Sequence, residues 1–196
     1  REEVEHRVGA GRRRSCRRTW HRRGRGRRST AEGVKRFVEL SSVGSYGRPV
    51  ESPCKETCAK RPRNDYEKSK WEGEKAAFAF DRQNGMRVTA LRPTLVYGPR
   101  SKYGHAMYLG LFTLLKENGK TKTPILRGGP WGHHVHVVDV ARAALLLAEH
   151  PDAVGESFNI ADDTPLRGED FLRVICRNTG LEAEATLPFS AGISRT

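Results

Sequence analysis

Two stretches of apolar residues on either side of a charged segment predict a strand, a helix and a second strand. The first stretch, residues 34–42, carries Phe37, Val38 and Leu40 and then runs into small residues. The second, residues 87–93, holds a short apolar run that a proline ends. Runs of this kind are typical of buried parallel strands. The helix between them is therefore expected to be a crossover connection.

The later part of the chain predicts further alternating elements. Residues 107–116 form an apolar helix, and residues 133–148 read as a short strand followed by a helix. Residues 155–165 then read as a strand that ends in a turn, and residues 168–176 as a helix. Asp139 lies where the middle helix begins, where a carboxylate can accept free N–H groups and complement the helix dipole. We therefore interpret Asp139 as a helix cap.

The charged segment holds a tyrosine and a lysine whose side chains could take part in acid–base chemistry. Tyr66 and Lys70 are four residues apart and so share one helix face. An ammonium close to a phenol favours the ionised phenolate, which makes the tyrosine usable as an acid and base near neutral pH. The spacing by itself also fits an amphipathic helix whose tyrosine packs and whose lysine is solvated. The neighbouring segments decide between these interpretations.

Those neighbours complete a specific pattern. Ser41-Ser42 precedes Tyr46-Gly47, the Tyr66/Lys70 pair follows, and residues 91–99 read Leu-Arg-Pro-Thr-Leu-Val-Tyr-Gly-Pro. With these motifs the chain resembles the extended short-chain dehydrogenase/reductase superfamily, which includes NAD-dependent epimerases and dehydratases. The resemblance covers roughly residues 32–190. It implies an α/β fold with a partial doubly wound, Rossmann-like parallel sheet and the start of a smaller C-terminal substrate domain.

The resemblance also implies roles for single residues. The catalytic residues would be Ser42, which holds the substrate oxygen, Tyr66 as the acid and base, and Lys70, which stabilises phenolate and binds ribose. By its position alone, Ser42 also fits a serine at the end of a strand whose hydroxyl is hydrogen-bonded within its own loop. The implied cofactor is NAD or NADP, with Pro93 and Thr94 on the nicotinamide face. The implied cofactor-binding set is Ser41, Tyr66, Lys70, Pro93 and Thr94.

The substrate is predicted from more local similarities. Residues 162–165, the helix at 168–176 and residues 187–190 are similar to the 3β-hydroxysteroid dehydrogenase/isomerase branch. This favours a secondary alcohol of a sterol-like substrate, converted to a ketone. The alternative is a nucleotide sugar, epimerised or dehydrated by the same three residues through a keto intermediate. A nucleotide sugar needs cationic and polar contacts for its pyrophosphate, whereas a sterol needs an apolar slot.

The apolar helix at residues 107–116 carries two interpretations. Met107, Leu111 and Leu115 recur at helical spacing, which is typical of a core-facing stripe. In the resembling enzymes the same segment faces the bound substrate. Both interpretations stay open.

A dinucleotide-binding fold of this type begins with a strand, a Gly-rich turn and a helix. Gly9-Ala10-Gly11 follows no apolar strand, and Arg14 stands where a third glycine should fall. We therefore expect that this half is missing and that the fold is truncated at both ends. The residue that selects NAD over NADP would lie in that half. A truncated, inactive fragment is thus a third functional interpretation.

Residues 1–31 differ from residues 32–196, which we treat as a single α/β domain. The first 30 residues hold twelve arginines, no lysine and three glutamates, which account for +9 of the net charge of +13. We expect this segment to be disordered. Arginine without lysine favours a coding sequence translated in a shifted frame or from a wrong start. A solvated tail and a nucleic-acid-binding arm are the alternatives, and a bare basic run is too weak a motif to predict nucleic acid as a partner.

Cysteines and histidines do not predict a metal site. Cys54 and Cys58 have no second ligand pair, so we interpret them as free thiols. His134 and His136 alternate on a strand and supply only part of a zinc site, so one histidine of this region is instead expected at the substrate cleft. No stretch approaches the roughly 18 apolar residues of a membrane span. We expect a cytoplasmic protein that binds a small molecule, and a homodimer is compatible with the resemblance.

Overall fold

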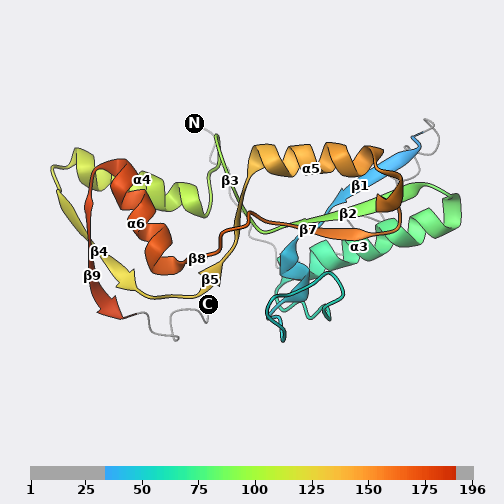
Figure 1. Cartoon of the computed structure of the whole chain (residues 1–196), viewed down its shortest axis with the longest axis horizontal. Coiled ribbons are helices and arrows are strands. Elements are labelled where there is room, and N and C mark those ends of the chain that lie inside the picture. The colour runs from blue at the N-terminus through green and yellow to red at the C-terminus, as the bar shows by residue number, and fades with distance from the viewer. Residues whose placement is uncertain (1–33, 189–196) are drawn as a thin grey trace, which may run out of the picture.

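A parallel sheet forms the first of two lobes in the computed structural model, which describes residues 34–188 (Figure 1). Its strands are β1 (Arg36–Leu40), β2 (Arg87–Pro93) and β7 (Ser157–Ile160), in the order β1-β2-β7. Both neighbouring pairs are parallel. Helix α3 (Asp65–Asn84) connects β1 to β2. The predicted α/β class and the predicted crossover are confirmed, whereas residues 1–31 lie outside the described residues.

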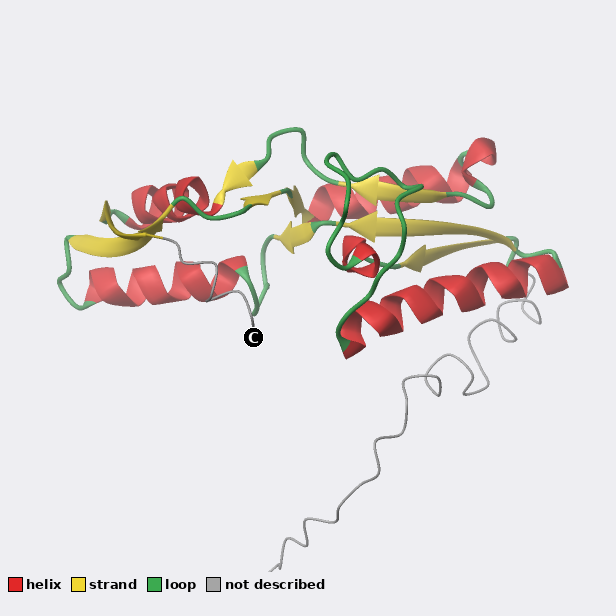
Figure 2. Ribbon diagram, turned by 90° about the horizontal axis from the view of Figure 1, so that it is seen from below, coloured by secondary structure: helices red, strands yellow, loops and turns green. Residues whose placement is uncertain are grey.

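Helices cover both faces of this sheet. Figure 2 shows α3 on one side of the strands and α5 (Val137–Glu149) on the other. Successive strand residues point to opposite faces, and β2 supplies a buried side chain to each. Val88 packs with Ala77 of α3, and Leu91 packs with Leu147 of α5. This two-sided burial explains why the apolar run of β2 is continuous rather than alternating.

The second lobe is built from α4 (His105–Glu117), β4 (Lys122–Arg127), α6 (Gly168–Thr179) and β9 (Glu182–Pro188). Strands β4 and β9 pair in parallel. The core of this lobe lies between the two helices and the strand pair, and its buried residues are Phe112, Ile125, Ile175, Cys176 and Leu181. No described helix has the length and apolar character needed to cross a membrane.

The core stripe predicted on α4 is correct for Leu115 alone among its three residues. Met107 and Leu111 are 64% and 51% exposed, so the core interpretation is wrong for both. Phe112 is the buried residue of this helix, and Leu115 packs against the same cluster. The helix is apolar on most of its surface, so spacing alone did not select the face that packs.

Short strand pairs join the lobes (Figure 1). Strand β3 (Leu95–Tyr97) pairs in parallel with β6 (His134–His136), and β5 (Trp131–Gly132) pairs antiparallel with β8 (Leu166–Arg167). Because β3 follows β2 after a single residue, the chain leads directly from the first sheet into the β3-β6 pair and toward the second lobe. Two short 3₁₀ helices complete the fold, η1 (Val43–Tyr46) and η2 (Pro151–Ala153).

Side chains at the helix starts define where α3 and α5 begin. Asn64 and Glu67 form a reciprocal capping box at α3. At α5 the cap is His136, whose ring accepts from the N–H of Val138, so the predicted cap at Asp139 is wrong. The helix begins before Asp139, which lies in its first turn and pairs with Arg142 at 3.2 Å. From this first turn, the Asp139 carboxylate still interacts favourably with the dipole of α5, as predicted.

Candidate active site

Ser42 lies two residues beyond the carboxyl end of β1. It is the N-cap of η1, and its Oγ accepts a hydrogen bond from the N–H of Gly44 at 3.0 Å. A Cβ placed on Gly44 would lie 3.3 Å from Ser42 Oγ and 3.8 Å from Cε1 of Tyr66. The hydroxyl and the phenol ring therefore face one small space, which the absence of a side chain at Gly44 leaves open.

Tyr66 and Lys70 occupy successive turns at the start of α3. The Tyr66 side chain is 59% exposed, and Lys70 Nζ lies 6.0 Å from the centroid of its ring. Lys70 Nζ also donates to the carbonyl oxygen of Leu40, the last residue of β1, at 2.8 Å. This bond ties the helix to the end of the strand that carries Ser42. The three residues predicted as catalytic are thus brought together, and their roles remain predictions.

The other predicted cofactor-binding residues lie at the ends of the strands. Ser41 is buried and its N–H donates to the carbonyl of Leu91 at 2.8 Å. Pro93 is buried as the last residue of β2. Thr94 follows it, and its hydroxyl donates to the carbonyl of Ile160 at 3.2 Å. These contacts place all three at the carboxyl ends of the parallel strands, the edge at which doubly wound sheets bind ligands.

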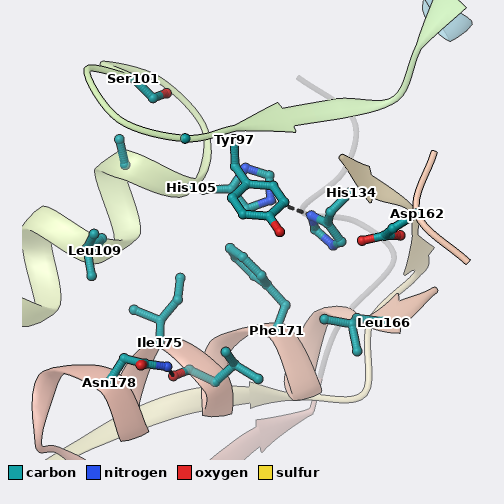
Figure 3. Close-up of a pocket in the computed structure, with 13 residues that line it drawn as sticks. Tyr97, Ser101, His105, Leu109, His134, Asp162, Leu166, Phe171, Ile175 and Asn178 are labelled. Carbon is teal, nitrogen blue, oxygen red and sulfur yellow. Dashed lines mark hydrogen bonds between the residues drawn. The ribbon is translucent and has the colours of Figure 1, made fainter. Parts of the chain in front are cut away.

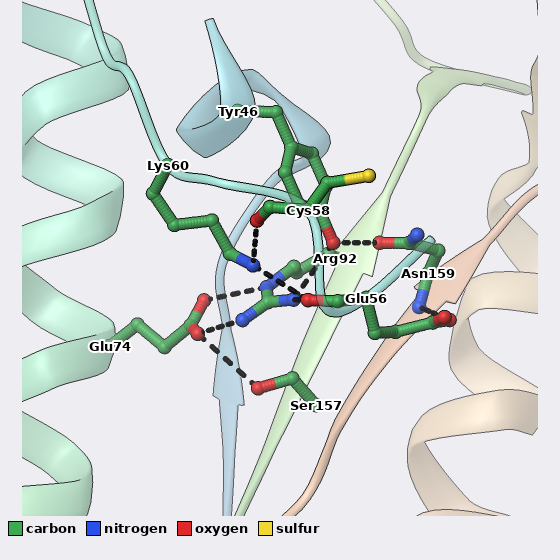
Figure 4. Close-up of polar contacts among 8 residues, drawn as sticks. All are labelled: Tyr46, Glu56, Cys58, Lys60, Glu74, Arg92, Ser157 and Asn159. Carbon is green, nitrogen blue, oxygen red and sulfur yellow. Dashed lines mark hydrogen bonds and ion pairs between the residues drawn. The ribbon is translucent and has the colours of Figure 1, made fainter. Parts of the chain in front are cut away.

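A buried ion pair behind the site was not predicted. Arg92 Nε donates to Glu74 Oε2 at 3.0 Å, and Arg92 Nη2 contacts Glu74 Oε1 (Figure 4). The side chains are only 4% and 1% exposed. Burial raises the pKa of the Glu74 carboxyl, but the hydrogen bonds and positive charge of Arg92, together with the hydrogen bond from the Ser157 hydroxyl, outweigh it, so the net pKa is below its usual value. Glu74 is therefore an ionised carboxylate inside the fold.

The same arginine holds the loop between η1 and α3. Arg92 Nη1 donates to the Tyr46 hydroxyl at 2.8 Å and to the carbonyl of Glu56 at 3.2 Å. The Tyr46 hydroxyl donates to Asn159 Oδ1 at 2.8 Å. Lys60 Nζ donates to the Glu56 carbonyl at 2.6 Å and lies 4.4 Å from the Tyr46 ring centroid. Burial raises the pKa of Tyr46 despite the nearby guanidinium.

One sequence signal could have identified this network. Tyr66, Lys70 and Glu74 are spaced by four residues, so Glu74 continues the stripe of the two predicted catalytic residues. A carboxylate on a helix face directed at a buried strand needs a cationic partner. Arg92, which lies inside an apolar run, is the evident cationic partner for this carboxylate.

The loop cysteines Cys54 and Cys58 are free thiols.

A pocket of about 470 Å³ lies between α4 and α6, next to β3 and β6 (Figure 3). Its aromatic side is formed by Tyr97, His105, His134 and Phe171, and Leu109 and Ile175 belong to its apolar wall. The structure thus places His134 in this pocket, and the expectation that one histidine of its region lies at the substrate cleft stays a prediction. His105 was not predicted as a site residue because no motif or spacing in its helix marks it as one.

The two histidines contact each other directly. His105 Nε2 and His134 Nδ1 form a short hydrogen bond, and the ring of Phe171 stacks on His134 with centroids 5.1 Å apart. Burial lowers the pKa of His105, and the neighbouring His134 lowers it further. Burial also lowers the pKa of His134; Asp162 opposes this effect and His133 adds to it. The pair is therefore held in its neutral form.

Comparison with known proteins adds independent information. The model of the NAD dependent epimerase/dehydratase family matches residues 27–161, more than half of the chain. A UDP-glucose 4-epimerase of Lacticaseibacillus casei is 32% identical over 82% of this chain and 54% of its own. Cinnamoyl-CoA reductase 1 of Petunia hybrida is 31% identical over 62% of this chain and 38% of its own.

A solved structure agrees with this result. The UDP-glucose 4-epimerase of Thermotoga maritima with UDP-glucose superposes with a TM-score of 0.68 and 30% identity, covering 85% of this chain and 55% of that one. The chain spans about half the length of the relatives it matches. Because the family model matches more than half of the chain, the chain belongs to the NAD dependent epimerase/dehydratase family, as the motifs in residues 41–99 predict.

Proposed function

We propose that the chain interconverts a secondary alcohol and a ketone in an NAD(P)-dependent reaction. The observation that carries this proposal is the convergence of the Ser42 hydroxyl and the Tyr66 ring on the space at Gly44, with Lys70 fixed to the end of β1. A phenol can transfer the proton in this chemistry, an ammonium can stabilise the phenolate, and a hydroxyl can hold the substrate oxygen. Membership of an NAD-dependent family supports the same reaction.

Each residue has a definite task in this proposal. Ser42 donates a hydrogen bond to the reacting oxygen of the substrate and holds it beside the phenol. Tyr66 takes the hydroxyl proton when the alcohol is oxidised and returns it when the ketone is reduced. Lys70 stabilises the phenolate electrostatically. The exposure of Tyr66 leaves its ring accessible to a substrate.

The residues present fit the nicotinamide end of NAD or NADP. A lysine ammonium has three donors, and the Leu40 carbonyl takes one, so Lys70 can also reach a ribose hydroxyl. Thr94 and the end of β2 lie at the same edge of the sheet. When bound, the nicotinamide supplies the hydride acceptor and donor.

For the substrate, the comparisons favour a nucleotide sugar over a sterol. The Lacticaseibacillus casei and Thermotoga maritima relatives are both UDP-glucose 4-epimerases. Epimerisation needs a transient ketone: a bound nicotinamide would supply the hydride acceptor and donor, while Tyr66 takes and returns the proton and Ser42 holds the oxygen. The steroid-like substrate suggested by residues 162–165 and 187–190 has no comparable support among these relatives.

The direct test is conversion of UDP-glucose to UDP-galactose by the full 196-residue chain with NAD. We expect Tyr66→Phe to lower the rate by at least about 100-fold, since acid–base groups contribute that much or more. Tyr103→Phe is the matched control, because Tyr103 is 80% exposed and belongs to the loop between β3 and α4 rather than to α3. Binding of NAD(H), followed by nicotinamide fluorescence, is measured in parallel.

Two results would contradict the proposal. A folded chain that binds neither NAD(H) nor NADP(H) is an inactive fragment. Equal rates for the Tyr66→Phe and Tyr103→Phe variants would remove Tyr66 from the reaction. Turnover of another secondary alcohol, but not of UDP-glucose, would keep the reaction and exclude the nucleotide sugar.

A further inference from the structure

Helix α4 carries an apolar stripe on the side that faces away from the core of the second lobe. Met107 and Leu114 are 64% and 55% exposed, and Leu111 beside them is 51% exposed. Because successive helix residues are about 100° apart, Met107 and Leu114 lie about 140° and 160° from Phe112, the buried residue of the helix. None of the three exposed residues lines the pocket between α4 and α6. Exposed apolar side chains that gather in one stripe are typical of an interaction surface.

Gly110 lies in the middle of this stripe, where its own surroundings do not call for a glycine. A Cβ added to it would meet no other atom of the described chain within 4 Å. A glycine inside a helix is also less favourable than an alanine, because it loses more backbone freedom on folding. The missing side chain does leave a gap between Met107 and Leu114, and two helices approach each other most closely where the residues at the contact are small.

The spacing of the stripe fits a second helix that packs along its length. Met107, Gly110, Leu114 and Glu117 follow one another at intervals of three, four and three residues. Residues that recur in this way form the seam at which two helices pack at a small crossing angle. A helical partner therefore matches this surface better than an irregular segment does.

The stripe is also self-complementary, which favours a second copy of the chain. A two-fold axis between Gly110 and Leu111 would place Met107 of one copy against Leu114 of the other, and the same contact would occur twice. Each large side chain then meets a large one at the ends of the seam, and each glycine meets the Leu111 of the other copy at its centre. The two helices run antiparallel in this arrangement.

The charges at the two ends of α4 match the same arrangement. Lys102 lies just before the helix, Glu117 is its last residue, and both are exposed. Neither forms an ion pair within the part of the chain that the structure describes. Lys116 is directed elsewhere, because its Nζ donates to the carbonyl of Gly180 at 2.9 Å. An antiparallel pair would bring the lysine end of each copy beside the glutamate end of the other.

We propose that α4 packs antiparallel against α4 of a second copy of the chain, with the stripe from Met107 to Leu114 at the seam and a Lys102–Glu117 pair at each end. The predicted catalytic residues belong to the first lobe, so this dimer contact goes beyond the proposed function and does not depend on it. A helix of 13 residues is about 20 Å long. Since so short a contact is small for a specific interface, we expect a dissociation constant of about 1–100 μM.

The test is sedimentation equilibrium of the full 196-residue chain between about 1 and 300 μM, a range that covers this constant. We expect the mean mass to rise from that of a monomer toward that of a dimer. Leu114→Lys should raise the dissociation constant at least about tenfold, because a charge enters the seam twice. Leu146→Lys is the matched control, since Leu146 is 62% exposed on α5 of the first lobe, and it should leave the constant unchanged.

Charge reversal tests the antiparallel register. Lys102→Glu and Glu117→Lys each place like charges together at both ends, and we expect each to raise the dissociation constant about threefold, with a larger effect at low salt. The double variant restores opposite charges and should return the constant to nearly its original value. A parallel pair would show no such rescue. Both positions are exposed, so these variants also serve if Leu114→Lys does not fold.

Cosedimentation with vesicles of phosphatidylcholine and phosphatidylserine is measured in parallel, because a membrane surface also takes up an exposed apolar helix face. Four outcomes overturn the inference: a monomer over the whole range, a dimer that Leu114→Lys leaves intact, no rescue by the double charge reversal, or a monomer that binds vesicles through Leu114. These measurements involve no cofactor and no turnover. An inactive chain that dimerises would therefore refute only the proposed function, and an active monomer only this inference.

Discussion

Glu74 of α3 and Arg92 of β2 form a buried ion pair that joins the helix of Tyr66 and Lys70 to the centre of the sheet. Glu74 lies one turn beyond Lys70 on the same helix face. Ser157 of β7 also donates to Glu74 Oε1, at 3.2 Å. The carboxylate therefore contacts two neighbouring strands and sets the position of α3 above the edge where the predicted catalytic residues meet.

Loss of this carboxylate should destabilise the fold strongly. We expect Glu74→Gln to reduce the free energy of unfolding by about 3–5 kcal/mol, because it leaves the Arg92 guanidinium buried without a counter-charge. Urea unfolding measures this change. Glu72→Gln is the matched control on the same helix: its ion pair with Lys75 is about half exposed and should contribute no more than about 0.5 kcal/mol. Equal effects of both variants would show that the buried pair has no special role.

Two glycines with nearly the same backbone conformation separate strain from collision. Gly47 has φ 64° and ψ −122°, and Gly104 has φ 57° and ψ −115°. A Cβ on Gly47 would lie 1.9 Å from the Arg61 carbonyl oxygen, whereas Gly104 has open space around it. We expect Gly104→Ala to cost about 1–3 kcal/mol, the strain of a positive φ in a residue other than glycine. Gly47→Ala should cost clearly more because the loop must also move, and thermal unfolding compares them.

Gly44 should control access to the Ser42 hydroxyl and the Tyr66 ring. A methyl group there contacts both, at 3.3 and 3.8 Å. We expect Gly44→Ala to lower turnover about tenfold, because small displacements of reacting groups are costly, while the unfolding free energy changes by less than about 1 kcal/mol. Gly110→Ala on α4, where the added Cβ meets nothing, is the control. Unchanged turnover in the Gly44 variant would mean that the substrate does not enter this space.

Acid should destabilise the second lobe through its histidine pair. Burial lowers the pKa of both His105 and His134 in the folded chain, so the unfolded chain binds protons more readily. Stability is therefore complete above the ordinary histidine pKa of 6.5 and falls as the pH drops below it. Urea unfolding between pH 8 and 5 should show this loss, and His134→Phe should reduce the slope. A slope that is identical in both proteins would contradict the assignment.

Local patterns determined much of the fold and the predicted catalytic residues. The apolar run at residues 87–93 specifies a buried strand because only a sheet covered on both faces accommodates it, whereas β1, predicted to be buried as well, is only partly buried and its Leu40 is 51% exposed. The spacing places Tyr66 and Lys70 on one helix face, since residues four apart lie one turn from each other, and the neighbouring motifs gave the pair its predicted role. Their approach to Ser42 followed from the motif in residues 41–99 and from the parallel crossover.

Contacts between distant segments required the tertiary structure. Arg92 meets Glu74 across 18 positions, and His105 meets His134 across 29. The spacing of Glu74 from Lys70 indicates a carboxylate that needs a cation, and no pattern links His105 to His134; which side chains actually meet depends on how the helices are placed on the strands. The buried face of α4 was undetermined for the same reason: its apolar residues surround the helix, and only packing against α6 and β4 selected Phe112 over Leu111. Periodicity thus determined the elements, while the burial of charged and aromatic partners decided how they are joined.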